Sequence, residues 1–316
     1  MSTDRPPLRY LRIAITSRCN LRCVHCRPAR STEGQDLLTA DQIVDFVGHA
    51  VACGIRKVRL TGGEPLVRAD VVELVGRLAA LPGLEGLGLT TNGCLLPRLA
   101  VPLRQAGLRR VNIGLSALDP AVYDRMTRRA RGARAMAGLE AALAAGFRPV
   151  KVNVVVMRGI NDGEVASLAR LSRDERIEVR FIEYMPFGAQ PELRARYLVP
   201  AGEVLARLGE LGEVEPLAEP RGQASAARYR IRGFAGTVGI IAPHSEPFCC
   251  DCDRIRLTAD GKLRACLIDG GEQDILPLLR AGLDHRTVAR LLAQAAARKP
   301  AVHSGAFRGE MHRIGG

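Results

Sequence analysis

Three cysteines stand close together near the start of the chain, at Cys19, Cys23 and Cys26. They come directly after residues 8–16, an apolar alternating run that predicts a strand. Thiolates only a few residues apart can converge on one metal centre as the backbone curls. Structural zinc prefers four closed ligands, so this triplet suits a zinc knuckle only if His25 or a remote group completes it. We therefore expect a four-iron four-sulfur cluster with one iron left open.

A second group of three cysteines lies near the other end, at Cys249, Cys252 and Cys266. A turn over 259–262 separates Cys266 from the first two, so a hairpin can again bring three thiols together with one metal position free. Cys250 is predicted to point away, because neighbouring side chains of an extended segment alternate. The alternative is a redox CxxC disulfide, but the thioredoxin-like βαβ context is missing. Cys53 and Cys94 are expected to be ordinary packed residues.

Composition favours a cytoplasmic enzyme-sized domain. The chain has 316 residues, of which 47% are hydrophobic, enough for a barrel-sized domain with an appendage. Most of its nine cysteines fall into the two groups, a pattern typical of metal ligation in a reducing cytosol. No apolar stretch is long enough to span a bilayer, and no leader precedes residue 8. We therefore expect a soluble, cytoplasmic protein without a membrane partner.

The formal net charge of +13 invites an interpretation as a nucleic-acid binder. Arginine and lysine are spread along the chain, however, and aromatic residues make up only 4%, whereas a nucleic-acid groove normally adds stacking rings to its charge. An anionic small substrate explains the excess equally well, and an arginine-rich composition with solvated surface charge explains most of it. We expect no nucleic-acid partner.

Between residues 8 and 205 the pattern strand, turn, helix repeats. Strands are predicted over 8–16, 57–61, 86–91, 110–115, 149–157 and 177–184, and helices over 39–53, 70–81, 95–106, 139–146, 162–171 and 201–211. Thr39 with Gln42, and Asn161, supply the expected helix caps. The fold class is therefore α/β, with a partial (β/α)6 TIM-like barrel over 1–212. A connection over 213–227 leads into a C-terminal region, 213–316, with strands at 228–232 and 237–241, the second cysteine group and helices over 274–281 and 284–297.

Polar residues inside the predicted strands are informative, because both faces of a parallel barrel sheet are covered. They are Arg12, Arg59 with Thr61, Asn112, Lys151 with Asn153, and Glu183. Spacing by two residues keeps each pair on one face. If that face lines the barrel, it holds more cations than carboxylates, and an anionic ligand completes the balance. The alternative is that these side chains lie at strand ends and reach solvent.

The sequence Gly62-Gly63-Glu64-Pro65 follows the second strand at the edge where barrel active sites lie. Two glycines would let the backbone approach a ligand closely, and Glu64 would add an acceptor. Alone, this tetrapeptide could be a simple tight turn. Together with CxxxCxxC, it resembles the radical S-adenosylmethionine superfamily. In that family the open iron is chelated by S-adenosylmethionine, and one electron from the cluster cleaves it to a 5'-deoxyadenosyl radical.

The whole set of motifs resembles one family, GTP 3',8-cyclase, which begins molybdenum cofactor (molybdopterin) biosynthesis. The resemblance rests on both cysteine groups, GGEP, the pair Arg254 and Arg256, the Gly-Gly end, and the segments 89–93, 151–155, 159–162 and 180–185. It implies two 4Fe-4S clusters, one on Cys19, Cys23 and Cys26, and one on Cys249, Cys252 and Cys266 whose open iron binds guanine.

The resemblance also implies roles for individual residues. Gly63 and Met185 would contact S-adenosylmethionine, and GTP would contact Arg12, Arg59, Thr90, Lys151, Arg254 and Arg256. The Gly315-Gly316 tail would reach into the site. The radical would take hydrogen from ribose C3', and the resulting carbon radical would attack C8 to give 3',8-cyclo-7,8-dihydro-GTP.

Three positions depart from the family pattern. His25 stands where an aromatic residue, often Tyr, packs on adenine, and Arg27 stands where Met is common. Gly114 stands where the family has Ser, so a side-chain contact to S-adenosylmethionine is missing. These departures predict weaker or altered cofactor binding.

The resemblance implies partners as well. These are a flavodoxin or ferredoxin type reductant, cyclic pyranopterin monophosphate synthase as the next pathway enzyme, and a second copy in a homodimer. Another radical S-adenosylmethionine enzyme, with an auxiliary cluster and a peptide substrate, would be favoured if Arg254, Arg256 and the terminal glycines were absent. A zinc-stabilised nucleic-acid binder would be colourless and would lose affinity steeply with salt.

Overall fold

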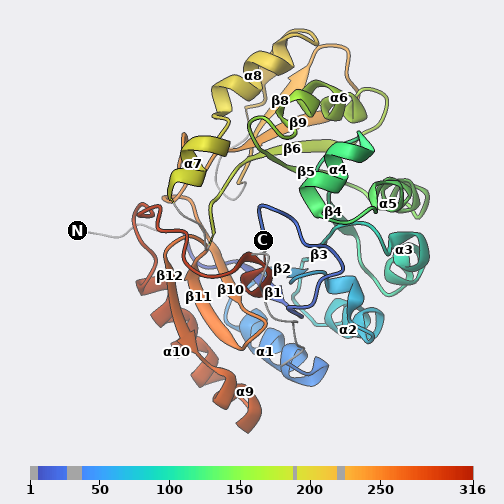
Figure 1. Ribbon diagram of the computed structural model, residues 1–316. Helices are drawn as coiled ribbons and strands as arrows, with labels where there is room; N and C mark the ends of the chain where they lie inside the picture. The colour runs from blue at the N-terminus through green and yellow to red at the C-terminus, as the bar shows by residue number, and fades with distance from the viewer. Residues whose placement is uncertain (1–5, 27–37, 188–190, 219–224, 316) are drawn as a thin grey trace.

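The computed structural model describes residues 6–26, 38–187, 191–218 and 225–315. Its centre is a 12-stranded sheet in the order β12-β11-β10-β1-β2-β3-β4-β5-β6-β9-β8-β7. The six central strands, all parallel, are β1 (Tyr10–Ala14), β2 (Lys57–Thr61), β3 (Gly86–Thr91), β4 (Arg110–Gly114), β5 (Val150–Val156) and β6 (Glu178–Glu183). The sheet curls with helices on its outer side (Figure 1). The predicted partial barrel is confirmed.

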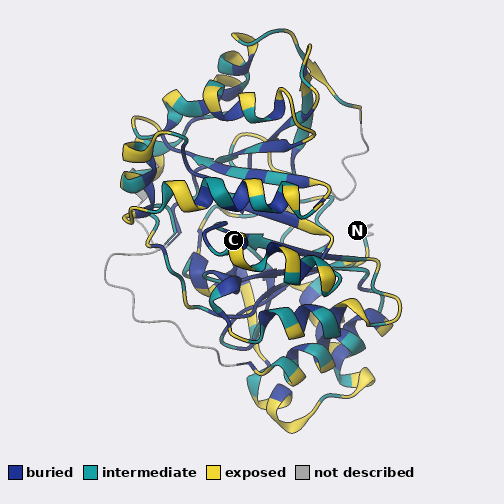
Figure 2. Cartoon of the chain, turned by 90° about the vertical axis from the view of Figure 1, so that its right-hand side faces the viewer, coloured by how far each residue is buried: buried dark blue, intermediate teal, exposed yellow. Residues whose placement is uncertain are grey.

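The helices of the barrel cover the sheet with one apolar face each. They are α1 (Ala40–Ala52), α2 (Val71–Ala79), α3 (Leu96–Gln105), α4 (Pro120–Thr127), α5 (Gly132–Ala144), α6 (Val165–Ala169), α7 (Pro191–Tyr197) and α8 (Ala201–Gly209), with short 3-10 turns η1 (Pro65–Val67), η2 (Asp162–Glu164) and η3 (Arg170–Ser172). The predicted capping box of Thr39 and Gln42 begins α1. In Figure 2 the inward faces of the helices and the strands beneath them are buried. No helix among the described residues is long and apolar enough to cross a membrane.

Two features of the barrel were predicted wrongly. The helix expected over 139–146 is α5, which begins at Gly132, and α4 before it was missed. Asp119 begins α4 by accepting from the backbone N–H groups of Ala121 and Val122. The expected cap at Asn161 is also wrong: its side chain accepts from Met157 N and donates to the carbonyls of Ser116 and Val155. Asn161 therefore fixes the loop after β5 instead of beginning a helix.

Residues 213–316 extend the same sheet at both edges. Their elements are β7 (Val214–Pro216), β8 (Ala227–Ile231), β9 (Thr237–Ile241), β10 (Arg254–Leu257), β11 (Lys262–Cys266), β12 (Gly270–Asp274), α9 (Leu276–Ala281), α10 (His285–Ala297) and α11 (Met311–Ile314). Strand β9 pairs in parallel with β6, and β10 pairs in parallel with β1. The C-terminal cysteine group is thereby carried to the strand that precedes the N-terminal group. The connection expected over 213–227 contains one further short strand, β7.

One buried side chain ties the C-terminal hairpin to the end of the chain. Arg264 on β11 is only 1% exposed. Its guanidinium donates to the carbonyls of Cys266 at 2.8 Å, Leu267 at 2.7 Å and Arg308 at 2.6 Å, and it also pairs with Glu272. Two consecutive carbonyls where β11 ends and one near the end of the chain thus depend on one cation.

We predict that Arg264→Met lowers the free energy of unfolding by about 3–5 kcal/mol, because it leaves buried acceptors without their donor. Thermal and urea unfolding of the full chain measure the change. The exposed Arg280, changed to Met, is the matched control. A melting temperature equal to that of the control would contradict this role.

Candidate active site

The inside of the barrel contains a cavity of about 500 Å³, a size typical of small-molecule sites. Cationic side chains line it from six strands: Arg12, Lys57, Arg59, Arg110, Lys151, Arg180, Arg254 and Arg256. Among the lining residues that the structure describes, Asp253 is the one carboxylate. The cavity therefore has the charge of an anion-binding site, as the polar strand residues predicted.

Strand register explains how the cations come together. Arg12 lies opposite Arg59 on β2 and opposite Arg256 on β10, so three guanidinium groups share one face on adjacent strands. Burial, helped by Arg59 and Arg254, lowers the pKa of Arg12 to about 10. Burial likewise lowers the pKa of Arg256, and Arg12 and Arg254 add to the effect. Each charge disfavours the next, so an anion bound among them would be stabilising.

A buried carboxylate holds another part of the cationic wall. Lys151 donates to Glu178 at 2.8 Å, Arg180 also pairs with Glu178, and Arg228 Nε lies 3.5 Å from the same carboxylate. Although burial favours the neutral acid, Arg180 and Lys151 hold the pKa of Glu178 below its ordinary value. Burial and Arg180 lower the pKa of Lys151 to about 8. Glu178 thus orients cations that would otherwise repel one another.

Sequence reasoning missed part of this wall. Lys57, Arg110 and Arg180, which line the cavity, and Glu178, which pairs with two of the cations, were not singled out, although spacing by two from Arg59, Asn112 and Ile182 puts them on the same face. Glu183 was singled out only as a polar residue that ends the sixth strand. It lies on the other face, where its carboxylate accepts from the backbone N–H groups of Ala201, His244 and Ser245.

Several buried polar atoms on the barrel strands have no hydrogen-bond partner among the residues that the structure describes. The oxygens Thr61 Oγ1, Thr90 Oγ1, Asn112 Oδ1 and Asn153 Oδ1 are buried and accept or donate no hydrogen bond within the described residues. Thr90 does not itself line the cavity, but it pairs in register with Asn112, which does. Buried polar atoms are normally satisfied, so this edge of the barrel fits a polar ligand.

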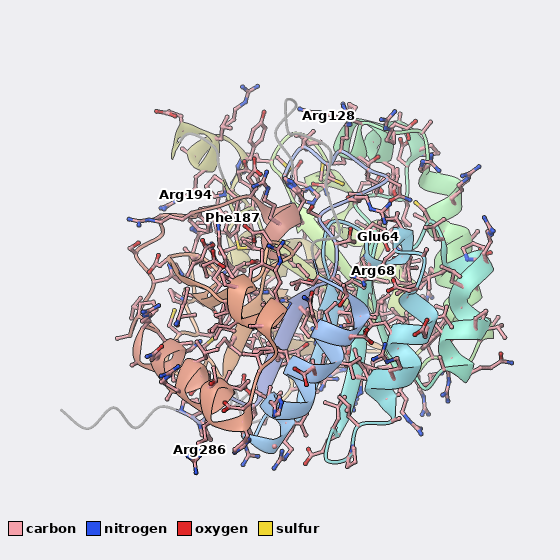
Figure 3. The ribbon with its side chains drawn as sticks, turned by 90° about the horizontal axis from the view of Figure 1, so that it is seen from below. Glu64, Arg68, Arg128, Phe187, Arg194 and Arg286 are labelled. Carbon is pink, nitrogen blue, oxygen red and sulfur yellow. The ribbon has the colours of Figure 1, made fainter. Side chains whose placement is uncertain are left out.

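The first cysteine loop is held from two sides. Arg68, buried beside η1, donates to the carbonyls of Ile15 and Leu38, both at 2.8 Å, and so fixes the end of β1 (Figure 3). Within the loop, Arg22 N donates to Thr127 O at 3.0 Å and Val24 N donates to Met126 O at 2.8 Å. The loop is therefore attached to the end of α4, the helix that the sequence did not reveal.

The GGEP turn packs against the segment that enters the first cysteine loop. A Cβ on Gly63 would lie 2.3 Å from the carbonyl oxygen of Arg18, so only glycine fits against the segment that enters the cysteine loop. Glu64 was expected to offer an acceptor to a ligand. It is buried instead and accepts from Leu66 N, Thr91 Oγ1 and Asn92 N at 3.0, 2.7 and 2.6 Å. The Asn92 amide in turn donates to the side chain of Asn20 at 2.6 Å, beside the first cysteine.

The second cysteine group lies on the cavity wall. Cys249, Cys252 and Cys266 all line the cavity, whereas Cys250 is exposed and is not among the lining residues, as alternation predicted. Burial raises the pKa of Cys252, but Arg254 and Lys299 together bring it down to about 7. This sulfur is therefore the one most easily held as a thiolate.

An apolar cluster joins the two cysteine groups. Phe187, Ile268, Phe307, Met311 and Ile314 pack together, and Cys26 of the first group, Cys266 of the second and Met185 pack against them. Cys26 and Cys266 therefore lie against the same apolar cluster, although the two groups are far apart in the sequence and the first group does not line the cavity. The end of the chain closes over it: Arg256 donates to Gly315 O at 2.9 Å, and a Cβ on Gly315 would lie 1.9 Å from Thr61 Oγ1. Gly316 lies outside the described residues.

The departures from the family pattern have distinct settings. His25 Nδ1 is buried and has no partner within the described chain, and burial lowers the pKa of His25 to about 4. Its ring is therefore neutral at physiological pH and suits packing on another flat ring. At Gly114 a Cβ would meet only Thr91 O, at 3.8 Å, so there is room where the missing side chain would stand. Arg27 lies outside the described residues.

Both cysteine groups fit iron–sulfur clusters. Across the described ranges, no three His, Cys, Asp or Glu side chains are gathered around a single-ion position. A four-iron cluster binds each cysteine through a different iron, so its ligands stand farther apart. Neighbouring thiols influence one another in each group: burial, then Cys26 and Cys19, raise the pKa of Cys23, and burial, with Cys266 and Cys252, raises that of Cys249. A cluster bound in either group would have to hold these sulfurs as thiolates against that shift.

Two family models match consecutive parts of the chain. Residues 13–172 match the Radical SAM superfamily, and residues 177–305 match Molybdenum Cofactor Synthesis C. A GTP 3',8-cyclase of Moorella thermoacetica is 48% identical over 304 residues, 95% of this chain and 94% of that protein. Molybdenum cofactor biosynthesis protein 1 of Mus musculus is 42% identical over 302 residues, 94% of this chain and 47% of that longer protein.

Among solved structures, the chain is similar in fold to Streptococcus suis SuiB bound to S-adenosylmethionine. The TM-score is 0.64 at 15% identity, over 91% of this chain and 68% of that one. This likeness concerns the fold alone.

The buried Glu64 predicts a pH dependence. Burial raises the pKa of Glu64 from 4.5 to about 7, and its hydrogen bonds to Asn92, Thr91 and Leu66 only partly oppose this. Between these values the folded chain holds a proton that the unfolded chain has lost, so stability falls as pH rises through the window, by up to about 1.4 kcal/mol per pH unit.

We therefore expect the difference in unfolding free energy between the wild type and Glu64→Gln to change from pH 5 to pH 7, with the wild type losing stability relative to the variant. Urea unfolding at a series of pH values measures it. A difference that is constant over this range would rule out the shifted carboxyl.

Proposed function

Because this chain belongs to the GTP 3',8-cyclase family of the radical S-adenosylmethionine superfamily, we propose that it converts GTP to (8S)-3',8-cyclo-7,8-dihydroguanosine 5'-triphosphate in molybdenum cofactor biosynthesis. The observation that carries this proposal is the cation-lined cavity, whose wall includes the second cysteine group. A triphosphate supplies the anionic charge that this wall lacks.

Substrate binding falls to the cationic wall. Arg12, Arg59, Thr90, Lys151, Arg254 and Arg256 are the proposed GTP contacts, and their neighbours Lys57 and Arg180 on the same wall are further candidates. Guanidinium groups bind phosphate oxygens through paired donors, and Lys151, held by Glu178, acts as a point charge. The row formed by Arg256, Arg12 and Arg59 fixes where the charge of the ligand can lie.

We propose that Cys19, Cys23 and Cys26 hold the cluster that works with S-adenosylmethionine, and that Cys249, Cys252 and Cys266 hold a second 4Fe-4S cluster. When bound, the first cluster and S-adenosylmethionine supply a 5'-deoxyadenosyl radical. The backbone at Gly63, the His25 ring, the strand end at Gly114 and the Met185 side chain are the proposed contacts of this cofactor.

The remaining task of the protein is to exclude water and hold the ribose in place. Phe187, Phe307 and Met311 form an apolar wall beside the cavity. The rings of Phe187 and Phe307 pack edge to face, with their centroids 5.4 Å apart. The Gly315 segment closes the strand ends above Thr61. Both features favour a dry site in which a reactive radical meets substrate rather than solvent.

We also propose an acidic flavodoxin or ferredoxin type protein as the electron donor, cyclic pyranopterin monophosphate synthase as the consumer of the product, and a reducing cytoplasmic location. The nine free cysteines support the last point. A homodimer remains a family-level expectation.

The test of the function is an anaerobic assay. The chain is reconstituted with iron and sulfide, given GTP, S-adenosylmethionine and dithionite, and assayed for 5'-deoxyadenosine and the cyclised nucleotide. Both products are expected. Deoxyadenosine without GTP conversion would move the substrate elsewhere, to a peptide for example. Neither product from a fully loaded protein would refute the proposal.

Lys151→Met should raise KM for GTP roughly tenfold to a hundredfold, because one hydrogen bond to a charged group contributes about 1.5–3 kcal/mol. Initial rates of nucleotide formation at varied GTP measure this. Arg109→Met is the matched control, since Arg109 is exposed and does not line the cavity. Equal KM values for the two variants would remove Lys151 from the binding site.

Substitution of two nearby cysteines, one at a time, distinguishes a ligand of the second cluster from a thiol that binds no iron. Cys252→Ser should lose about half of the bound iron and all GTP conversion, since a three-cysteine cluster site loses a ligand. Cys250→Ser should retain both, because Cys250 is exposed. Iron analysis and the same assay give the answer, and equal iron in the two variants would disprove a cluster at this position.

A further inference from the structure

A lysine outside the predicted site touches the second cysteine group. Lys299 follows α10, and its ammonium group donates to Cys252 Sγ at 3.3 Å, Arg254 O at 2.7 Å and Ala265 O at 3.2 Å. These three acceptors all belong to the chain around the second group.

The two carbonyls belong to the segments that carry the ligands. Arg254 begins β10, directly after the turn with Cys252, and Ala265 immediately precedes Cys266 on β11. One side chain thus ties together both strands of the cysteine-bearing hairpin. Helix α10 packs against β11, and Lys299 N donates to Ala296 O as the helix ends, so the backbone that carries this lysine is itself fixed.

We propose that Lys299 is a positioning residue of the second cluster, which holds Cys252 and Cys266 at their mutual distance and raises the reduction potential of the cluster through its hydrogen bond to the Cys252 sulfur. The proposal rests on the proposed function, which supplies the cluster. Reduction adds negative charge to the cluster, and a nearby cation with an N–H donor to sulfur stabilises the reduced form.

A matched lysine is available on the same hairpin. Lys262 begins β11, and its ammonium group pairs with Asp260 at 3.1 Å rather than with a thiol. Lys262→Met therefore also removes one positive charge near the cysteine-bearing hairpin, without removing a contact to the cysteine group. Lys299→Met removes charge and donor, Lys299→Gln keeps a neutral donor, and Lys299→Arg keeps both.

The experiment isolates the second cluster in the full chain by changing Cys19, Cys23 and Cys26 to Ser in every variant. Each protein is reconstituted anaerobically, its iron and sulfide are counted, and its cluster is titrated with reductant while the reduced signal is followed by electron paramagnetic resonance. No GTP conversion is needed, so the readout is independent of the cyclase assay.

At a fixed potential, we expect the ratio of reduced to oxidised cluster to be at least tenfold lower in Lys299→Met than in the wild type. For a one-electron couple this corresponds to a fall in reduction potential of about 59 mV. The reduction potential of Lys299→Gln should lie between those of Lys299→Met and the wild type. The potentials of Lys299→Arg and Lys262→Met should equal that of the wild type. If Lys299→Met holds no iron, the positioning role is supported and the potentials of the Gln and Arg variants test the electrostatic role.

Equal potentials and equal iron contents in the Met, Gln and Arg variants would overturn the proposal. Iron missing from the unmodified Lys299 protein, with the first group removed, would instead refute the second cluster and with it that part of the proposed function. The two failures are therefore distinguishable.

Discussion

The structure depends on like charges held side by side inside a covered sheet. Arg256, Arg12 and Arg59 stand on neighbouring strands in register, and each is displaced from water by the barrel around it. Burying cations costs several kcal/mol each unless opposite charge is near. Glu178 offsets part of this cost at Lys151 and Arg180, and Asp253 is the one carboxylate among the described lining residues, against eight cations. The fold is thus built with a charge imbalance that a polyanion relieves.

The imbalance can exist only because the two ends of the chain share one sheet. Without the parallel pairing of β10 with β1, Arg254 and Arg256 would not reach Arg12, and the second cysteine group would not face the first. Small residues make room for the crowded charges: a Cβ on Gly88 would lie 3.2 Å from the Arg59 guanidinium, and one on Gly239 would lie 3.3 Å from the side chain of Arg180. The same pairing brings charge, thiols and apolar wall into one cavity.

Local pattern was sufficient for the barrel and for part of its charged face. The six central strands follow from β-branched runs, and spacing by two residues was enough to select Arg12, Arg59 and Lys151. Long-range pairing could not be predicted in the same way. Nothing local in Arg254–Leu257 says that it pairs with β1. Alternation along β6 places Glu183 on the face opposite Arg180 and Ile182, but it does not predict which distant backbone N–H groups the carboxylate binds. Helix α4 was missed because its signal is a cap at Asp119 rather than an apolar period.

One of the same cationic side chains also holds the C-terminal segment over the site. Arg256 belongs to the Arg row and also donates to Gly315 O, so the end of the chain is attached to a group whose energy depends on what fills the cavity. Gly315 is fixed on its other side by Thr61, which leaves no room for a side chain. Binding of an anion and docking of the C-terminal segment therefore both involve the Arg256 guanidinium. By thermodynamic linkage, each of these events changes the free energy of the other. A cavity in which a radical forms needs this coupling, because its entrance admits water when no substrate is bound to the cations.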